Sequence, residues 1–274
     1  MGQFTHLHVH TQYSILDGAA SIKGLIKKAK EFGMEALAIT DHGNMFGDLE
    51  FYNAAQKEGI KPILGCEAYV ARGSRFVKDG KNMSGDHLIL IAKNLKGYHN
   101  LIKLSSLSFD PNAFYRTSRI DKDLLFEHSE GIICSSACLG GIIPQMILAN
   151  NIPEAEKIIQ EYKEVFGEDY YIELQDHGTE DQLYVKPILI KLANKYGVKI
   201  IATNDVHFIN ASDFDAHRIL ICLNTGKKLS EDTKLVYTGQ EYLKSQKEME
   251  ELFYDIPEAI TNTQEIADKV EVYE

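Results

Sequence analysis

Residues 31–40, EFGMEALAIT, place the end of a helical pattern, a glycine and a short apolar run in direct succession. Gly33 stands where a helix ends in the left-handed conformation, and Ala36–Thr40 has the character of a buried strand. The same order recurs at residues 57–65 (KEGIKPILG), 165–174 (VFGEDYYIEL) and 195–203 (KYGVKIIAT). This recurrence predicts a chain of βα units around a parallel sheet.

The rest of the chain, as far as Asn204, also alternates between strand-like and helical segments. Apolar runs predict about seven strands, at Thr5–His10, Ala36–Thr40, Pro62–Tyr69, His87–Ala92, Gly131–Ser135, Tyr170–Leu174 and Lys199–Thr203. Helical spacing predicts helices at Ile22–Phe32, Gly47–Glu58, Tyr98–Leu107, Asp121–His128, Ile152–Phe166 and Asp181–Tyr196.

After Asn204 the pattern becomes mostly helical, at Ser212–Asn224, Lys247–Leu252 and Glu258–Val270, with one strand-like stretch near Leu235–Tyr242. No linker rich in Pro, Gly or Ser divides the chain. We therefore expect one α/β unit over residues 1–274, with a barrel over about 1–210 and a helical extension over about 211–274.

The composition excludes several classes of protein. The chain has 274 residues, of which 44% are hydrophobic and 25% are charged, so it is neither disordered nor collagen-like. Its net charge of −11 argues against binding a nucleic-acid backbone by bulk charge, although local basic patches are compatible with it. The sequence contains neither a long apolar run nor a signal-peptide pattern, which predicts a cytoplasmic protein without membrane contact.

Side chains of the kinds that bind metals follow the predicted strands. They are His8, His10, Asp17, Asp41, His42, Glu67, His87, Cys138, Asp205 and His207. In a barrel of parallel strands the carboxyl ends of the strands meet at one rim, so we expect these side chains to gather there. Imidazoles, carboxylates and a thiol together suit Zn²⁺, Mn²⁺ or Fe²⁺ better than Ca²⁺ or Mg²⁺. Their number exceeds the needs of one ion, which predicts two or three.

Each of these residues also has an ordinary structural explanation, and only their joint placement favours metal binding. His8 and His10 could simply be a pair of core histidines, and Glu67 could lie on a solvated face of its strand. Cys138 could be a small buried side chain. His6 lies on the same predicted face but nearer the buried end, so a ligand role is less favoured there. The other histidines and cysteines are expected to be ordinary: His99, His128, His177, His217, and in the core Cys66, Cys134 and Cys222.

Several motifs resemble those of the PHP (polymerase and histidinol phosphatase) superfamily. They are THLHVHTQYSILDGAASI, ITDHGNMFG, ILGCEAYV, HLILIAKN, SACLGG and ATNDVHF. The resemblance is closest to the PHP domain of the alpha subunit of bacterial DNA polymerase III. Longer stretches that extend beyond these motifs also resemble that branch, namely residues 119–141, 204–229 and 242–253. This resemblance implies a distorted seven-stranded βα barrel with a trinuclear metal site at its mouth.

The resemblance also implies how the ligands divide. One ion would be held by His8, His10, Glu67 and Asp205, a second by Glu67, His87 and Cys138, and a third by Asp17, His42 and His207. Asp41 matches a family motif but would orient a histidine rather than bind metal. Glu67, Asp205 and His10 would be catalytic through a metal-activated water that attacks phosphorus.

Three functions follow from this resemblance. The first is the PHP domain of a replicative polymerase, hydrolysing single-stranded DNA from its 3′ end. Its partners would be the rest of the alpha subunit, with palm and fingers domains outside this chain, and a proofreading exonuclease subunit. The second is a free-standing phosphomonoesterase of the histidinol phosphatase type. The third is a structural module that binds metals without turnover, stabilising the polymerase or docking the proofreading subunit.

Two positions depart from the family pattern. Ser118 stands before Arg119 where Pro is expected, and Asp176 stands where a basic residue is common. Both concern contacts to substrate rather than to metal. The basic side chains of Arg72, Arg75 and Lys78 would suit a phosphate backbone, but a solvated loop is the more ordinary interpretation of that stretch.

Overall fold

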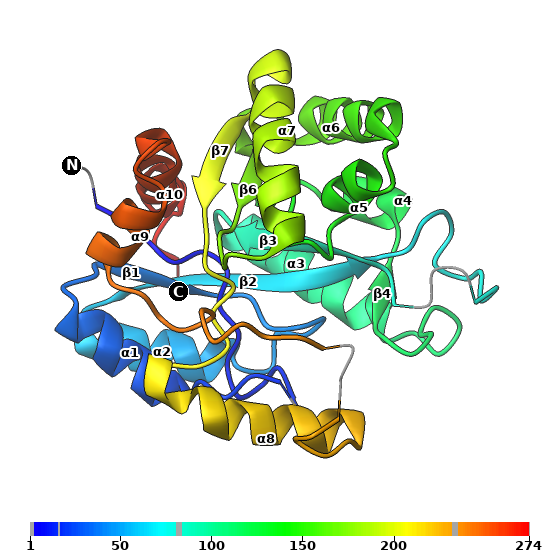
Figure 1. Cartoon of the computed structure of the whole chain (residues 1–274). Coiled ribbons are helices and arrows are strands. Elements are labelled where there is room, and N and C mark those ends of the chain that lie inside the picture. The colour runs from blue at the N-terminus through cyan, green and yellow to red at the C-terminus, as the bar shows by residue number, and fades with distance from the viewer. Residues whose placement is uncertain (1–2, 16, 81–83, 232–234, 274) are drawn as a thin grey trace.

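A mixed sheet curls into a distorted α/β barrel in the computed structural model, which describes residues 3–15, 17–80, 84–231 and 235–273 (Figure 1). The strands are β1 Ala36–Ile39, β2 Lys61–Val70, β3 Asp86–Ala92, β4 Arg119–Ile120, β5 Ile132–Ser135, β6 Tyr170–Leu174 and β7 Lys199–Ala202. Hydrogen bonds join them in the order β1-β2-β3-β5-β6-β7, and β4 pairs with β2. The predicted α/β barrel is therefore confirmed, whereas β4 was not predicted.

The predicted strand at residues 5–10 is an extended segment rather than a regular strand. Its backbone bonds on one side to the segment after β7, where His10 N donates to Val206 O at 2.7 Å. On the other side Ala38 N and Thr40 N, two residues apart, donate to the carbonyls of His6 and Val9, three residues apart. This unequal spacing prevents a regular ladder. The segment nevertheless links β1 to the chain after β7 and so helps to close the barrel.

The prediction of an all-parallel sheet is wrong at β3. β3 runs antiparallel to both β2 and β5, with Tyr69 opposite His87 and Glu67 opposite Ile89. The described residues of the connection between β2 and β3 contain no helix, and a parallel return would require a crossover. β3 therefore begins, rather than ends, at the rim where the parallel strands end.

The helices are α1 Ile22–Glu31, α2 Asp48–Glu58, α3 Leu95–Ser108, α4 Lys122–Glu127, α5 Ile142–Leu148, α6 Ile152–Phe166, α7 Glu180–Tyr196, α8 Phe214–Thr225, α9 Gln246–Leu252 and α10 Pro257–Lys269. All predicted helices are present within three residues of their expected bounds, and α5 is additional. Gly59 and Gly197 end α2 and α7 in the left-handed conformation, as expected. The strand-like stretch at 235–242 is wrong as a strand, since among its described residues it makes only a bridge between Tyr242 and Phe208.

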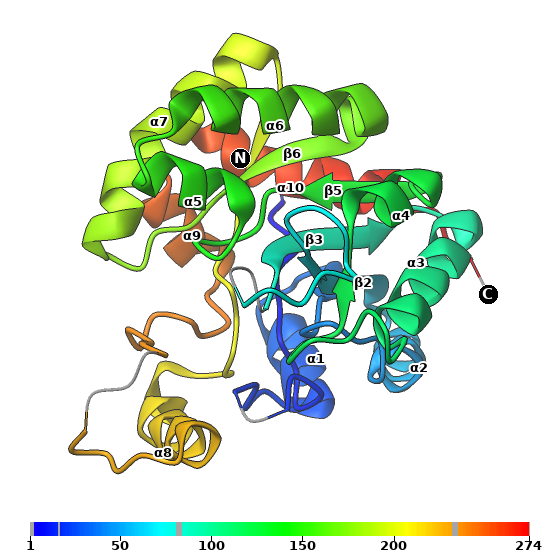
Figure 2. The same ribbon diagram turned by 90° about the vertical axis from the view of Figure 1, so that its right-hand side faces the viewer.

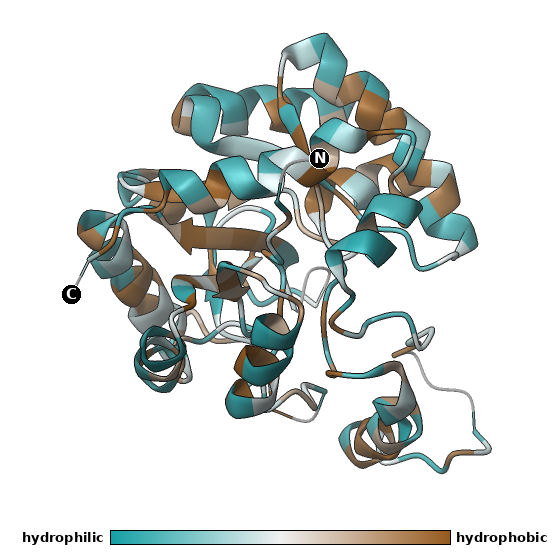
Figure 3. Ribbon diagram, turned by 90° about the vertical axis from the view of Figure 1, so that its left-hand side faces the viewer, coloured by the Kyte–Doolittle hydropathy of each residue, from teal (hydrophilic) through white to brown (hydrophobic). Residues whose placement is uncertain are grey.

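Alternation along the strands divides the core into an inner and an outer layer. Side chains such as Ile63, Ile91, Ile133 and Tyr171 point into the barrel, where Ile266 of α10 joins them. These strand residues lie at the end of the barrel opposite the mouth, which we call the floor. α10 closes the barrel there. Outward-facing side chains of the strands pack against buried apolar residues of the surrounding helices. These helices carry both hydrophobic and hydrophilic residues along their length (Figure 3).

The part of the chain after residue 210 does not form one body of helices. α10 packs against β7 and the barrel floor, whereas α8 lies at the end of loops, away from α6 and α7 (Figures 1 and 2). A boundary near residue 210 remains a prediction. Among the described residues, no helix has the length and apolar character needed to cross a bilayer.

Candidate metal centre

The nine predicted ligands lie together at the barrel mouth. His8 and His10 come from the extended segment, and Glu67 and His87 come from the two antiparallel strands β2 and β3. The remaining members lie in loops that follow the extended segment, β1, β5 and β7: Asp17, His42, Cys138, Asp205 and His207. Each of the nine contacts at least one other through a ligand-type atom.

Glu67 lies at the centre of this group and is fully buried. Its Oε1 lies 2.7 Å from His87 Nδ1, 3.3 Å from His8 Nε2 and 3.8 Å from Cys138 Sγ. Its Oε2 contacts His42 Nδ1 and lies 3.7 Å from His10 Nε2. The two oxygens therefore face two different sets of donors, as a bridging carboxylate would.

Two further sets of donors complete the arrangement. Asp205 Oδ1 lies 3.1 Å from His8 Nε2 and 3.2 Å from His10 Nε2. His10, His42 and His207 place ring nitrogens within 4.8 Å of one another. Within the predicted set Asp17, His42 and His207, His42 joins the other two: its Nε2 lies 3.1 Å from Asp17 Oδ2, and its ring also groups with those of His207 and His10.

Several buried polar atoms in this centre lack a hydrogen-bond partner among the described residues. They are Asp17 Oδ1, Asp205 Oδ1 and His207 Nε2. Asp205 Oδ1 is close to two histidines, but the angles are not those of a hydrogen bond. Burying an unpaired polar atom is unfavourable, and all three atoms are metal-ligand atoms. The residues present therefore fit divalent metal ions.

Protonated histidines neutralise the carboxylates when no metal is bound. Burial would raise the pKa of Glu67, but His87 and His42 hold it well below its usual range. Burial likewise opposes charge on His42, yet Glu67 and Asp17 raise the pKa of that imidazole well above its usual value. Metal ions would replace these protons, so metal binding should release protons to solvent.

The thiol of Cys138 is neutral in this setting. Burial raises its pKa well above the ordinary value, and the charges of Asp205 and Glu67 act in the same direction. A thiolate at this position therefore requires a cation beside it, which a bound metal would supply.

The centre is exposed to solvent on one side. The side chains of Asp17, Asp205, His42 and His87 are 12%, 17%, 18% and 26% exposed, whereas those of His8 and His10 are fully buried. Asp205 also has a φ of 47°, a left-handed conformation that is uncommon outside glycine and is found often at functional sites.

Asp41 reaches a histidine only through an intermediate. Its Oδ1 accepts a hydrogen bond from Ser14 Oγ at 2.7 Å, and Ser14 Oγ lies 3.0 Å from His10 Nδ1. Two further bonds come from Thr11, through its backbone N at 2.6 Å and its Oγ1 at 2.8 Å. Asp41 therefore bonds to Ser14, which in turn contacts His10, and its role in orienting a metal ligand stays a prediction.

Glu173 on β6 was missed by the sequence analysis. Its Oε1 lies 2.6 Å from His8 Nδ1 and accepts hydrogen bonds from Thr203 Oγ1 and Gln175 Nε2, while Oε2 accepts one from Ser135 Oγ. The side chain is fully buried. The available signal was a charged residue at an inward-facing position of an apolar strand, where a partner is needed.

The other histidines differ in their distance from the centre. His6 points away and bonds through Nε2 to Lys244 O at 2.8 Å, so it does not join the ligands. His217, expected to be ordinary, lies beside the centre, because its Nε2 bonds to Asp17 O at 2.8 Å and its ring centroid is 6.1 Å from that of His207. His99, His128 and His177 do not belong to any of the metal-competent groups found among the described residues.

Two of the three cysteines expected in the core are buried there, Cys66 and Cys134. The expectation is wrong for Cys222, which is half-buried and lines a pocket, because α8 is open to solvent on one side.

The basic loop after β2 is held by partners within the protein. Arg72 pairs with Asp86 at 2.7 Å, Arg75 pairs with Asp121 at 2.8 Å, and Lys78 Nζ donates to the Pro111 carbonyl. These contacts favour the structural interpretation of the loop over a phosphate track.

The departures from the family pattern are also accommodated. Ser118 Oγ donates to Gly43 O at 2.9 Å, and Asp176 lies 3.5 Å from Lys186. Neither residue leaves a buried charge unpaired.

Comparison with known proteins places the chain in a family. The model of the PHP domain matches residues 6–177. DNA polymerase III subunit alpha of Borreliella burgdorferi is 51% identical over 270 residues, which cover 97% of this chain and 24% of that protein. The same subunit of Helicobacter pylori is 47% identical over 277 residues, covering 97% of this chain and 23% of that protein. The chain thus spans about a quarter of the length of the curated relatives it matches.

Among solved structures, an amidohydrolase from Chromobacterium violaceum superposes with a TM-score of 0.47 at 16% identity, over 74% of this chain and 87% of that one. The family model covers more than half of the chain, and the residues that carry its motifs form the cluster at the barrel mouth. The chain belongs to the PHP domain family.

Proposed function

We propose that this chain is the PHP domain of a DNA polymerase III alpha subunit and that its centre hydrolyses phosphodiesters at the 3′ end of single-stranded DNA. The observation that carries the hydrolytic part is the cluster of nine ligand-type side chains, with the buried Glu67 at its centre. The similarity to alpha subunits over 97% of the chain supports the polymerase part, because it continues well beyond residue 177 where the family model ends.

The contacts support the following ligand sets. His8, His10, Glu67 and Asp205 would hold one ion, and Glu67, His87 and Cys138 a second. A third would take Asp17, His42 and His207, with His10 close enough to share it. The mixture of imidazole, carboxylate and thiol favours Zn²⁺, Mn²⁺ or Fe²⁺.

Bound divalent ions would supply a nucleophilic water at neutral pH and neutralise charge on the phosphate. The protein's own part is positioning. Glu67 directs one oxygen to each of two donor sets and so fixes their separation. Glu173 and Ser14 hold the Nδ1 atoms of His8 and His10, which aims both Nε2 atoms into the centre. Substitutions of Glu67, Asp205 and His10 are therefore expected to reduce turnover the most.

A test combines metal analysis with hydrolysis. The metal-loaded chain should release nucleotides from 3′-labelled single-stranded DNA, and Glu67→Gln should reduce the rate by about 1,000-fold or more, a loss of about 4 kcal/mol. Glu156→Gln removes a glutamate carboxylate of α6 that pairs with Lys195 of α7 and belongs to none of the ligand sets, and it should leave the rate unchanged.

The same experiment separates the alternatives. Turnover of small phosphate monoesters with no action on DNA would support a free-standing phosphomonoesterase instead. Bound metal without turnover of either substrate would support a structural module, whose partners would be the rest of the alpha subunit and a proofreading exonuclease subunit.

A further inference from the structure

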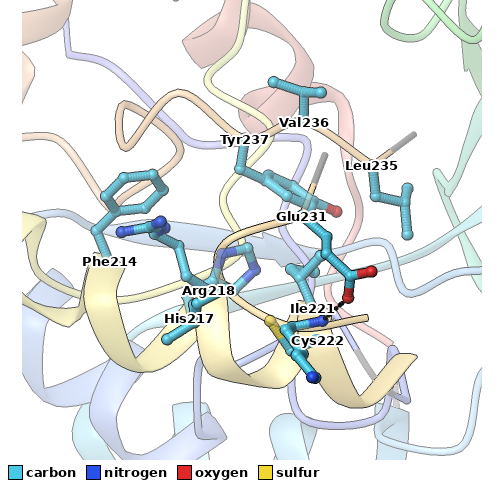
Figure 4. A pocket seen from close by; sticks show the side chains of 11 residues that line it. Phe214, His217, Arg218, Ile221, Cys222, Glu231, Leu235, Val236 and Tyr237 are labelled. Atoms are coloured by element: carbon cyan, nitrogen blue, oxygen red, sulfur yellow. Dashed lines mark hydrogen bonds between the residues drawn. The ribbon is translucent and has the colours of Figure 1, made fainter. Parts of the chain in front are cut away.

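A pocket of about 250 Å³ lies between α8 and described residues that follow it, among them Glu231 and Tyr237. His217, Arg218, Ile221 and Cys222 line it from α8, while Tyr237 lies across from the helix (Figure 4). No part of the proposed ligand sets lies in this lining. The volume is somewhat below the range typical of drug-sized ligands, so it suits a small unit such as one nucleotide.

The pocket adjoins the metal centre through two aromatic side chains. The Tyr237 ring centroid lies 4.8 Å from that of His207 and 4.5 Å from that of His217. His217 in turn bonds to the backbone carbonyl of Asp17. Two of the proposed ligands, Asp17 and His207, therefore stand directly behind the pocket wall.

The lining combines two cations with apolar and aromatic surface. The Arg218 side chain is 48% exposed, and its ion-pair partner Asp215, at 3.7 Å, is almost fully exposed, so the pair holds the guanidinium only weakly. The Lys228 ammonium group makes no hydrogen bond or ion pair with any residue that the structure describes. Glu231, the acid of the lining, is engaged by the backbone N of Lys228 at 2.7 Å.

This combination is that of sites for single-stranded nucleic acid. Arg and Lys side chains bind phosphate oxygens, while aromatic and apolar surface stacks against a base. Phe214 and Tyr237 provide rings in the lining, and Ile221 and Leu235 provide aliphatic surface. The chain as a whole has a net charge of −11, which disfavours binding of a phosphate backbone. Two cationic side chains beside the centre therefore matter more for attracting one.

We infer that this pocket between α8 and Tyr237 is the subsite that holds a terminal nucleotide of a single-stranded nucleic acid, with Arg218 and Lys228 on its phosphates. The inference rests on the proposed function, since it supplies the substrate contact for the same centre. The nucleotide in the pocket would place its neighbouring phosphodiester at the mouth, beside His207.

The test is direct binding of a 12-nucleotide oligothymidine by fluorescence anisotropy. The probe carries fluorescein at its 5′ end and phosphorothioates at its last two linkages, which retain charge and resist hydrolysis. The double variant Arg218→Gln/Lys228→Gln should bind about tenfold more weakly and lose about 1.4 from the slope of log Kd against log salt, or 0.7 for each phosphate contact.

The matched control is Lys157→Gln/Lys191→Gln, which removes two exposed lysines from α6 and α7. It should leave Kd and the salt slope as in the unmodified chain. Both double variants should retain their metal content and melting temperature, and the control variant should hydrolyse bis(4-nitrophenyl) phosphate with a kcat/KM within twofold of the unmodified chain.

The outcomes separate the inference from the proposed function. Equal Kd and equal salt slope for the two double variants would overturn the inference, whatever the hydrolysis shows. Failure of the metal-loaded, unmodified chain to hydrolyse either diester or DNA would contradict the proposed function, while the anisotropy would still decide whether the pocket binds the strand.

Discussion

Glu173 offers a quantitative test of how the centre is held. The substitution Glu173→Gln preserves the size of the side chain and removes its charge. Oε1 accepts from His8, Thr203 and Gln175, and an amide oxygen can still serve all three at the same position. The amide NH₂ would then face Ser135 Oγ, whose hydroxyl can turn to accept. The variant should therefore fold.

The expected loss concerns metal affinity. A hydrogen bond to a charged acceptor contributes about 1.5 to 3 kcal/mol and a neutral one about 1 kcal/mol, so the exchange at His8 costs about 0.5 to 2 kcal/mol. At 1.4 kcal/mol for each factor of ten, this predicts about 2- to 30-fold weaker binding, which overlaps the 10- to 100-fold effects usual for residues that orient metal ligands.

The assay is competition for Zn²⁺ or Mn²⁺ against a chelator of known affinity, followed by calorimetry. Glu156→Gln, which changes a carboxylate paired with Lys195 of α7, is the control and should bind metal as the unmodified chain does. If Glu173→Gln binds metal with unchanged affinity while the control also does, then His8 is not positioned by Glu173 and the reasoning fails.

Three further predictions concern stability. Removing metal with EDTA should lower the melting temperature by about 8 to 16 °C, since saturation at 1,000 times Kd contributes about 4 kcal/mol and this chain length gives about 2 to 4 °C per kcal/mol; an unchanged melting temperature would contradict a loaded centre. Ile266→Ala should cost about 2 to 5 kcal/mol in urea unfolding because it opens a cavity in the barrel floor, yet leave metal affinity unchanged; a large loss of metal would show that floor and mouth are coupled. Burial lowers the pKa of Lys244 from 10.5 to about 8, so its charge destabilises the fold fully below pH 8 and the penalty disappears towards pH 10.5. The stability of Lys244→Met relative to the unmodified chain should therefore fall by up to about 3 kcal/mol, 2.5 pKa units at 1.36 kcal/mol each, between these pH values; a constant difference in urea unfolding across that range would contradict the assignment.

The sequence predicted the helices and most strands because their signals are local. Gly59 and Gly197 mark helix ends through a conformation that other residues avoid, and apolar spacing is visible within a few turns. Strand direction is not local, because β3 has the same apolar pattern whichever way it runs. The irregular bonding of Val9 and the two-residue β4 also depend on neighbours distant in the chain.

The candidate site likewise contains some residues that could be identified from the sequence and others that could not. His8 and His10 could be identified from their alternation and from a family motif. Glu173 could not, because a single glutamate in a strand gives no indication of its partner, and His8 is 165 residues away. His217 and Tyr237 likewise reach the centre only through the placement of α8 and the segment after it.

The reversal of β3 has a consequence for how this rim can change during evolution. Glu67 and His87 lie on paired strands, and the ladder fixes their separation two residues apart in register. The length of the connection between those strands therefore does not enter the geometry of the centre. Residues can be added to or lost from that connection, altering what enters the mouth, without moving either side chain. A hairpin thus separates the part of the barrel that must stay constant from a part that is free to diversify.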